Sequence, residues 1–398
     1  MKPALAADRR EHLIGAYRRT LLDDSLPFWL EHGLDRRFGG IMTSLDREGR
    51  ILDTDKGVWQ QGRFAWVLGR LYNTVERRPE WLDAAESILR FLQAHAFDRD
   101  GRMFFQLARD GRPIRKRRYA FSEAFAAMAF GEHAQATESE ASKAIAAKLF
   151  RAFAAHVPSP PKFTGERPMK SLAVPMIRIA VAQSLRGSIG LEGAEGEIDR
   201  AVDEIRQDFM KPGIGCCMEN VGPAGELVDS FDGRLLNPGH AIEGAWFLMR
   251  EGELRDRGDY VRAGCDVLDW MWERGWDREY GGLYAFRDVD DKPVAEYWHD
   301  MKFWWPHNEA VIATLLAYQL TGDGRYAAMH ARTHDYAYAL FPDPAYGEWF
   351  GYFHRDGRLS TPLKGNLFKG CFHVPRQALE CWRIAGAIEP GRPERPAS

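Results

Sequence analysis

The chain has 398 residues, of which 45% are hydrophobic and 28% are charged, and its formal net charge is −3. No apolar run approaches the roughly 20 residues that a membrane-spanning helix requires, and the weak net charge gives no general attraction to nucleic acid or anionic membranes. We therefore expect a soluble protein with a sizeable core and with neither nucleic acid nor membrane as a partner.

Cysteine usage and the N-terminus predict the compartment. The five cysteines are odd in number and lack the CxxC spacing of a zinc or redox site: Cys216, Cys217, Cys265, Cys371 and Cys381. The first residues, MKPALAADRREHL, carry charge where a signal peptide needs an apolar stretch. Both features favour a cytoplasmic protein.

A glycine-rich aromatic tract that leads into an Asp/Gly turn recurs along the chain. Strand-type residues flank each turn, which is typical of a β-hairpin. The copies begin at Phe38, Gly101, Gly213, Tyr280 and Gly347. Successive copies start about 60 residues apart, except for one gap of about 110, or two periods. The sequence therefore predicts six units, one of which lacks its hairpin.

Pairs of helices are predicted between these tracts, because apolar residues recur there at helical spacing. Examples are residues 57–76 with 80–96, 118–135 with 139–156, and 237–253 with 258–274. A proline stands just ahead of an apolar stretch in four successive units, at Pro175, Pro238, Pro306 and Pro375. Proline is favoured at the first helical position, so we expect equivalent helices to begin at these four residues.

About twelve helices in six pairs predict an all-α fold, an (α/α)6 barrel with short β-hairpins between the helices. An open solenoid of helix pairs is the alternative, but such a solenoid rarely carries a glycine and aromatic hairpin in every unit. No linker interrupts the pattern before the C-terminal GRPERPAS. We expect one catalytic domain over residues 1–390 and a flexible tail over residues 391–398.

Candidate catalytic residues collect where the proline-led helices begin, and these helix starts should face a common mouth. In NPGHAIEGAW, Asn237 can cap the helix, and His240 and Glu243 follow it three residues apart, on one helix face. We expect both side chains to point into the barrel.

Two further segments carry histidine near a helix start. WWPHNEA contains His307 and Glu309, and CFHVPRQ contains His373. A single histidine beside aromatic residues is more often a hydrogen-bonded core residue, but histidines in three successive units indicate a shared site. Zinc ligation by His240, His307 and His373 is an alternative. The sequence has no HExxH or comparable pair of ligands, so we predict no metal.

Arg63 lies in VWQQGRFAWVLGRLY, on an otherwise apolar and aromatic helix. Burying an arginine there is costly without an anionic partner. The side chain either faces an anionic ligand or forms a structural salt bridge, and the sequence leaves both open.

Six segments spread along the chain resemble N-acylglucosamine 2-epimerases, also called renin-binding proteins. They are LPFWLEHGLDRRFGGIMTSLDREGRILDTDKGVWQQGRFAWVLGRLYN, RDGRPIRKRRYAFSEAFAAMAF, LAVPMI, NPGHAIEGAWFL, KFWWPHNEA and KGCFHVPR. The resemblance runs nearly end to end and extends to the wider superfamily that includes cellobiose 2-epimerases. It implies an (α/α)6 barrel.

The resemblance also implies residue roles. His240 and His373 would be the acid/base pair, with Glu243, Arg63 and His307 in the same pocket. Aromatic ring faces stack on the C–H surfaces of sugars, so we predict that the sugar is bound by the tryptophans of these segments together with His307 and a carboxylate. The predicted sugar-binding residues are His307, Trp59, Trp304, Trp305 and Glu309.

The implied reaction inverts carbon 2 of a ring-opened aldose, either an N-acylglucosamine or a parent aldose. One histidine removes a proton, a cis-enediolate forms, and the other histidine returns a proton to the opposite face. Arg63 and the positive helix ends would stabilise the anion. No metal or redox cofactor is required. These epimerases are often activated by ATP, and because the sequence has no P-loop we expect ATP only as a regulator. A homodimer is the expected assembly.

Other functions remain open at this point. Aldose–ketose isomerases of the mannose isomerase type and cellobiose or mannose 2-epimerases share the fold and the enediolate. They resemble one another in a further histidine on the inner helix of the third unit, where this chain has Met176. That difference favours the N-acylglucosamine branch. Glycoside hydrolases on this barrel need paired carboxylates about 6.5–9.5 Å apart, whereas the mouth positions here hold histidine. A sugar-sensing or protein-binding module is the non-enzymatic alternative.

A basic run follows the second tract: Arg109, Arg112, Arg115, Lys116, Arg117 and Arg118. Such a run can bind nucleic acid or a nucleotide phosphate. Its place on a predicted hairpin and at a helix start favours a solvated arm.

Overall fold

The computed structural model describes residues 5–116, 120–156 and 167–389. The expected tail, residues 391–398, lies outside these ranges, as do Arg117 and Arg118 of the basic run. Residues 157–166, which fall in the long gap between the second and third tracts, are also outside them.

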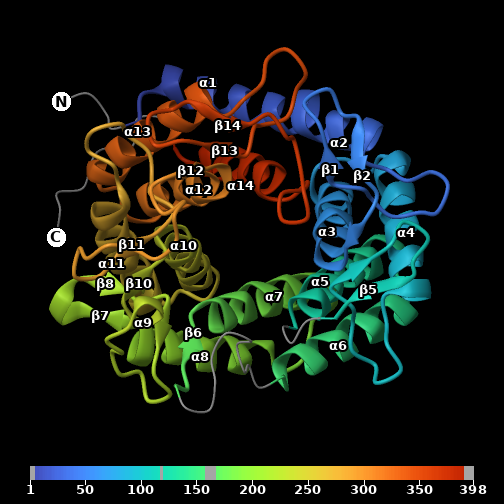
Figure 1. Cartoon of the computed structure of the whole chain (residues 1–398), viewed down its shortest axis with the longest axis horizontal. Coiled ribbons are helices and arrows are strands. Elements are labelled where there is room, and N and C mark those ends of the chain that lie inside the picture. Colours follow the sequence, from blue (N-terminus) through green and yellow to red (C-terminus); the bar gives the residue numbers. More distant parts are fainter. Residues whose placement is uncertain (1–4, 117–119, 157–166, 390–398) are drawn as a thin grey trace.

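The helices form two concentric rings, as Figure 1 shows along the barrel axis. The inner ring consists of α3 (Val58–Thr74), α5 (Phe121–Thr137), α7 (Ala173–Ile189), α10 (Pro238–Leu254), α12 (Trp304–Thr321) and α14 (His373–Ala387). The outer ring consists of α4 (Pro79–His95), α6 (Glu140–Ala154), α8 (Ala194–Glu204) with η2 (Ile205–Phe209), α11 (Gly258–Gly275), α13 (Gly324–Leu340), and α1 (Ala7–Arg19) continued by η1 (Thr20–Ser25) and α2 (Leu26–His32). Two short helices, η3 (Pro212–Ile214) and α9 (Phe231–Arg234), lie in loops. This arrangement is the predicted (α/α)6 barrel.

Sequence pattern separates the two rings. The inner helices α5 and α12 are apolar around most of their circumference and are buried on every face. The outer helix α4 buries one stripe that includes Trp81, Ile88 and Leu92, and it leaves polar residues on the opposite side. A helix that is hydrophobic all round is stable only inside a protein, whereas a striped helix covers a core. The main core lies between the rings.

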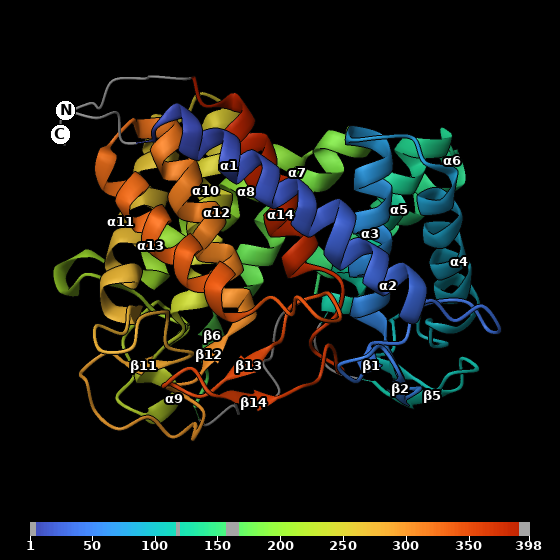
Figure 2. The ribbon, with the colours of Figure 1, turned by 90° about the horizontal axis from the view of Figure 1, so that it is seen from above.

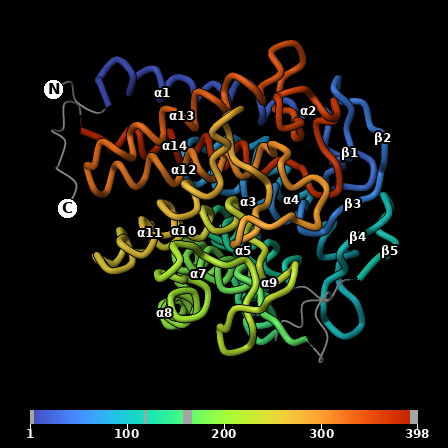
Figure 3. The backbone as a smooth tube through the Cα atoms, turned by 60° about the vertical axis from the view of Figure 1, so that its left-hand side comes forward, coloured from blue at the N-terminus to red at the C-terminus, as the bar shows by residue number. Residues whose placement is uncertain are grey.

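Each inner helix contacts the outer helix that follows it in sequence, with one exception. The last inner helix, α14, packs against α1, from the start of the described chain. Arg10 of α1 donates from Nε to the carbonyl of Ile388 and from Nη2 to the carbonyl of Gly386, at 2.9 Å each. Figure 3 shows the first helix beside α13 and α14, so the barrel is closed by opposite ends of the chain.

Short strands gather at the end of the barrel where the inner helices begin (Figure 2). They are β1 (Ser44–Leu45), β2 (Ile51–Asp53), β3 (Lys56–Gly57), β4 (Gln106–Leu107), β5 (Pro113–Arg115), β6 (Lys170–Ser171), β7 (Met210–Lys211), β8 (Cys216–Cys217), β9 (Asn220–Val221), β10 (Leu235–Leu236), β11 (Arg287–Asp288), β12 (Lys302–Phe303), β13 (Tyr352–Phe353) and β14 (Leu359–Thr361). All their pairings are antiparallel. In four units the strand that leads into the inner helix pairs with a strand beyond the outer helix of that unit, as β3–β4, β6–β9, β10–β11 and β12–β13. This pairing fixes where an inner helix begins.

Three of the predicted hairpins are confirmed, namely β1–β2, β4–β5 and β13–β14. The tracts that begin at Gly213 and Tyr280 do not fold back on themselves, and for them the prediction was wrong. In the first tract β8 pairs with β7 and β9 pairs with β6, and in the second β11 pairs with β10. Backbone donors of both tracts are used by other segments, because the N–H of Glu219 bonds the carbonyl oxygen of Leu235 and that of Val289 bonds the carbonyl oxygen of Arg234.

The prediction that four inner helices begin at a proline also needs correction. Pro238 is the first residue of α10, as predicted. Pro175, Pro306 and Pro375 are instead the third residues of their helices. The first four N–H groups of a helix have no intrahelical acceptor, so proline is tolerated throughout the first turn. The three histidines consequently do not occupy equivalent helical positions.

A buried ion pair recurs at the strand end of the barrel. In each case a lysine Nζ bonds the aspartate that opens a turn, at 2.9–3.0 Å, with both side chains at most 1% exposed: Lys56 with Asp35, Lys302 with Asp277, and Lys364 with Asp343. Lys56 and Lys302 lie in β3 and β12, directly before inner helices. These pairs anchor the helix starts to the loops.

The described part of the basic run is largely neutralised. Arg109 bonds Asp35 at 3.0 Å, Arg112 bonds Asp110 at 2.9 Å, and Lys116 bonds two aspartates at 2.6 Å. This agrees with the solvated-arm interpretation. Nowhere in the described chain is a helix both long and apolar enough to cross a membrane.

Candidate active site

A cavity of about 800 Å³ lies at the end of the barrel where the inner helices begin. The predicted site residues that line it are Trp59, Arg63, His240, Glu243, Trp304, Trp305 and His373. They come from α3, α10, α12 and α14. Seven of the nine predicted residues therefore meet in one place.

His240 is held at the start of α10 by two groups. The side chain of Asn237 caps the helix by accepting the backbone N–H of His240 at 3.1 Å, as the sequence predicted. Nδ1 of the imidazole lies 3.1 Å from both carboxylate oxygens of Glu219. With Nδ1 donating to Glu219, Nε2 remains for the cavity.

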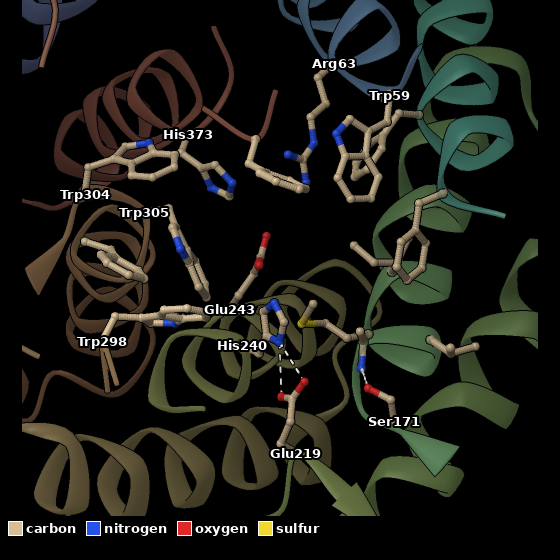
Figure 4. A pocket seen from close by; sticks show the side chains of 18 of the residues that line it. Trp59, Arg63, Ser171, Glu219, His240, Glu243, Trp298, Trp304, Trp305 and His373 are labelled. Atoms are coloured by element: carbon tan, nitrogen blue, oxygen red, sulfur yellow. Dashed lines mark hydrogen bonds and ion pairs between the residues drawn. The ribbon is translucent and has the colours of Figure 1, made fainter. Parts of the chain in front are cut away.

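His373 is the first residue of α14 and has its own carboxylate. Its Nδ1 lies 2.7 Å from Oε1 of Glu309, on α12. Arg376, one turn further along α14, donates from Nη2 to the same Glu309 oxygen at 2.7 Å and also to Glu243. Figure 4 shows the imidazoles of His373 and His240 approaching the cavity from opposite sides.

Trp305 lies beside both imidazoles. Its ring centroid is 5.1 Å from that of His240 and 5.9 Å from that of His373. The indole therefore closes the α12 side of the space between the two rings.

Arg63 reaches the cavity from the second turn of α3. A Cβ at Gly62 would lie 2.7 Å from the backbone of Phe125, so glycine here lets α3 and α5 approach closely. The guanidinium stacks 4.2 Å from the ring centroid of Phe125 and 4.7 Å from that of Phe372. Its Nε is buried with no hydrogen-bond acceptor in the described residues, and within those residues no carboxylate lies at ion-pair distance. A structural salt bridge is therefore not its role here.

The two imidazoles have different electrostatic surroundings. Burial lowers the pKa of His240, but the charges of Glu219 and Glu243 outweigh this effect, so the pKa is raised above its ordinary value. Burial lowers the pKa of His373 far below its ordinary value, and the cations Arg376 and Arg63 lower it further. Near neutral pH this arrangement favours a proton on His240 and a free Nε2 lone pair on His373.

His307 does not lie in the cavity lining, which corrects its predicted place. Its Nε2 accepts the backbone N–H of Leu283 at 2.9 Å, and its Nδ1 lies 2.6 Å from the carbonyl oxygen of Phe303. The ring is fully buried, stacks on Tyr336, and has its pKa lowered to about 3 by burial. It joins the loop at Leu283 to the start of α12 and contacts no cavity space.

Glu309 also lies outside the lining. It sits behind His373, fully buried, and additionally accepts the indole N–H of Trp246 at 2.8 Å. Its position suits orienting His373 rather than touching a sugar.

Two residues of the site were missed by sequence reasoning. Glu219 lies between the short strands β8 and β9, in GCCMEN, where the sequence pattern does not show which way a side chain points. Arg376 could have been found, because it follows His373 by three residues and so shares its helix face, as Glu243 does with His240. The ligand atoms of Glu243, Glu309 and His373 lie within 4.8 Å of one another, which could suit a metal. In this structure, however, the guanidinium of Arg376 bonds both carboxylates.

Comparisons with known proteins show the family of the chain and agree with its fold. Residues 39–373 match the family model of N-acylglucosamine 2-epimerase. The N-acylglucosamine 2-epimerase of Bos taurus is 38% identical over 378 residues, covering 90% of this chain and 88% of the relative. The Homo sapiens protein of the same name is 36% identical over 383 residues, covering 92% and 89%. The structure of cellobiose 2-epimerase from Bacillus thermoamylovorans B4167 aligns with a TM-score of 0.83 at 18% identity, covering 94% of this chain and 99% of that one, which shows the shared barrel. The chain belongs to the N-acylglucosamine 2-epimerase family.

Proposed function

We propose that the chain interconverts N-acylglucosamine and N-acylmannosamine by moving a proton at carbon 2 of the ring-opened sugar. The observation that carries the proposal is the pair of imidazoles on opposite sides of one cavity, each with a carboxylate at Nδ1. Inversion of a carbon by proton transfer requires a proton acceptor on one face and a proton donor on the other.

The reaction balances with groups of the chain alone. One imidazole Nε2 takes the proton from carbon 2, and the C–H electrons form the C1–C2 double bond of an enolate whose negative charge lies on O1. The second imidazolium then delivers a proton to the opposite face of carbon 2, and the O1–C1 double bond re-forms. Each turnover leaves the two histidines with exchanged protonation, which solvent resets.

The electrostatic surroundings divide the two roles. His373 lies near two guanidinium groups and is unprotonated in the free enzyme near neutral pH. It is therefore the base in one direction of the interconversion. His240, beside Glu219, is the acid that completes the inversion. In the reverse direction the sugar meets the same pair with the two roles exchanged.

Arg63 and the inner-helix ends supply positive potential for the enolate. The guanidinium lines the cavity and has no carboxylate partner in the described residues, so it is available to O1. Burial lowers the pKa of Arg63 to about 9, with Glu243 opposing the shift, so the group remains a cation at neutral pH. Donors held in place before the charge develops are most effective in such sites.

The acyl group of the substrate fits the wall opposite Trp305. Phe125, Met176 and Ile177 line the cavity from α5 and α7. The Cγ of Met176 lies 3.5 Å from where a Cβ would stand on Gly244, one residue after Glu243. This places an apolar surface next to the helix that carries His240, where a methyl group attached through the carbon 2 nitrogen would pack.

Proton NMR in D2O tests the proposal with N-acetylglucosamine as the substrate. Wild-type protein should form N-acetylmannosamine with deuterium at carbon 2. His240→Asn and His373→Asn should each lower interconversion by about 10²- to 10⁴-fold. Each variant should still exchange the carbon 2 proton of one epimer, and the two variants should exchange different epimers.

Three results would contradict the proposal. Epimer formed without solvent label would exclude the enolate. Exchange into the same epimer by both variants would show that one histidine serves both faces. A ketohexose as the main product from mannose would identify an aldose–ketose isomerase instead.

We further propose a cytoplasmic location and a reaction without metal or redox cofactor. All five cysteines are buried and free, which suits a reducing compartment. Every proton in the scheme is carried by residues of the chain, so ATP would act only as a regulator and a homodimer would not contribute to the chemistry.

A further inference from the structure

Behind His373 lies a buried cluster of charged side chains, which we call the carboxylate cluster: Glu243, Glu309, Arg376 and His373. The ligand atoms of its two carboxylates and its imidazole lie within 4.8 Å of one another. Each side chain of the cluster is at most 9% exposed. Two carboxylates so close in a buried place require a cation between them.

Arg376 supplies that cation through a single nitrogen. Its Nη2 bonds Oε1 of Glu243 and Oε1 of Glu309, and it lies 3.4 Å from Nδ1 of His373. The guanidinium also covers the ring of Phe372 at 4.4 Å, while its Nε is buried without an acceptor in the described part of the chain. The group is therefore fixed from several sides and does not line the cavity.

We propose that Arg376 is a positioning residue that stands where a metal cation would otherwise stand between Glu243 and Glu309, and that it holds these carboxylates so that His373 presents Nε2 to the cavity. This inference rests on the proposed function, since it assigns how one of the two proton carriers is set. Nδ1 of His373 donates to Glu309, and because a guanidinium can only donate, Arg376 meets Nδ1 as a neighbouring charge and not as a hydrogen-bond partner.

Charged and titratable groups face His373 from every helix packed around it. Glu309 comes from α12, Glu243 and His240 from α10, Arg63 from α3, and Arg376 from its own helix. The two carboxylates are balanced by the two guanidinium groups. Without Arg376, only the guanidinium of Arg63 would oppose the two carboxylates, and a proton on His373 would become favourable. A base that is already protonated cannot accept the proton of carbon 2.

Two variants separate charge from geometry. In Arg376→Gln the cation is lost, so kcat for deuterium exchange should fall about 100-fold, and the acid limb of kcat/KM against pH should move up by about one pH unit. In Arg376→Lys the positive charge is kept, so the acid limb should stay near its wild-type position. The lysine ammonium cannot hold both carboxylates as the guanidinium does, so kcat should fall about 10-fold. KM for N-acetylglucosamine should change less than kcat in both variants.

Arg186→Gln is the matched control. Arg186 makes a bidentate pair at 2.7 and 2.8 Å with the buried Glu251, between α7 and α10 and outside the cavity lining. Its loss should lower stability without moving the acid limb. A general structural effect would make Arg186→Gln and Arg376→Gln behave alike.

The outcomes separate this inference from the proposed function. A wild-type protein that exchanges no carbon 2 proton would end the proposed function. Active wild-type protein with an Arg376→Gln variant of normal kcat and pH profile would overturn only the role of Arg376. If Arg376→Gln does not fold, Arg376→Lys decides, because wild-type kcat in that variant contradicts the need to hold both carboxylates. NMR titration of the His373 ring in the same variant should find the pKa still below its ordinary value.

Discussion

Glu219 and His240 form a hydrogen-bonded pair across two segments of the chain, with both carboxylate oxygens 3.1 Å from Nδ1 of the imidazole. Glu219 comes directly before β9, and β9 pairs with β6, the strand that leads into α7. This strand pairing fixes the place of the carboxylate in the cavity lining. The Glu219 carboxylate helps to raise the pKa of His240, whereas burial and two guanidinium groups lower the pKa of His373.

Replacing Glu219 with Gln should lower the pKa of His240, because the carboxylate is the largest of the groups that raise it against burial. Less of the imidazole would then be protonated near neutral pH. The alkaline limb of the kcat profile should move to lower pH, and kcat at pH 8 should fall about 10-fold. Glu226→Gln, just beyond β9 and outside the cavity lining, is the control and should leave the limb in place. An unchanged limb in Glu219→Gln would contradict the assignment of His240 as the acid.

Replacing Arg63 with Gln should lower kcat for epimerisation by about 10²- to 10³-fold with a smaller change in KM, because its charge is needed most when the enolate forms. Steady-state kinetics with N-acetylglucosamine measures both parameters. Arg70→Gln, two turns further along α3 and paired with Glu132 outside the cavity, should retain wild-type kcat. A larger effect on KM than on kcat would show that Arg63 binds the ground state instead.

Replacing His307 with Gln should reduce the free energy of unfolding by about 2 kcal/mol, because two buried partners lose their hydrogen bonds. The kcat/KM should stay within about threefold of wild type, since the ring contacts no cavity space. Burial lowers the pKa of His307 to about 3, so its contribution to stability is present above pH 6.5 and is lost as the pH falls toward 3. As the pH falls from 6.5 toward 3, the free energy of unfolding should therefore decrease less steeply in the variant than in wild type, with slopes that differ by about 1.4 kcal/mol per pH unit. Urea unfolding at a series of pH values measures both slopes. Loss of activity in a folded variant would return His307 to the site.

Replacing Lys56 with Met should cost about 3 kcal/mol of unfolding free energy, because breaking a buried ion pair leaves a buried charge. Asp35 keeps Arg109, which holds the loss to the lower end of the usual range. Arg90→Ala removes an exposed i,i+4 pair with Glu86 and should cost under about 0.5 kcal/mol. Urea midpoints of the two variants give the comparison, and equal midpoints would show that the buried pair adds nothing.

The sequence predicted the barrel because its strongest signals are local and repeated. Apolar periodicity placed the helix pairs within a few residues, and the glycine-rich tracts counted the units. The pairing of strands was not predictable from those tracts, since β11 and β9 find their partners before the inner helices, some 50 residues earlier in the chain. The residues of a turn do not show whether a strand pairs with the next strand of its own tract or with the strand before the inner helix.

The site was predicted where helical spacing defines direction and missed where it does not. His240 and Glu243 share one face of α10, so their common orientation followed from their spacing. His307 was misplaced because its position after Pro306 was assumed to match that of His240 after Pro238, whereas the helices begin at different offsets from their prolines. One helical residue turns a side chain by about 100°, which is enough to move it from the cavity into the wall.

The contact between α1 and α14 joins two segments that lie far apart in the chain. His373 is the first residue of α14, so the helix that carries this imidazole has α1 as its outer partner rather than the helix that follows it in sequence. A deletion of α1, or a circular permutation that displaces it, should therefore uncover the apolar outer side of α14 and disturb the cavity at His373 although neither change touches a residue that lines it.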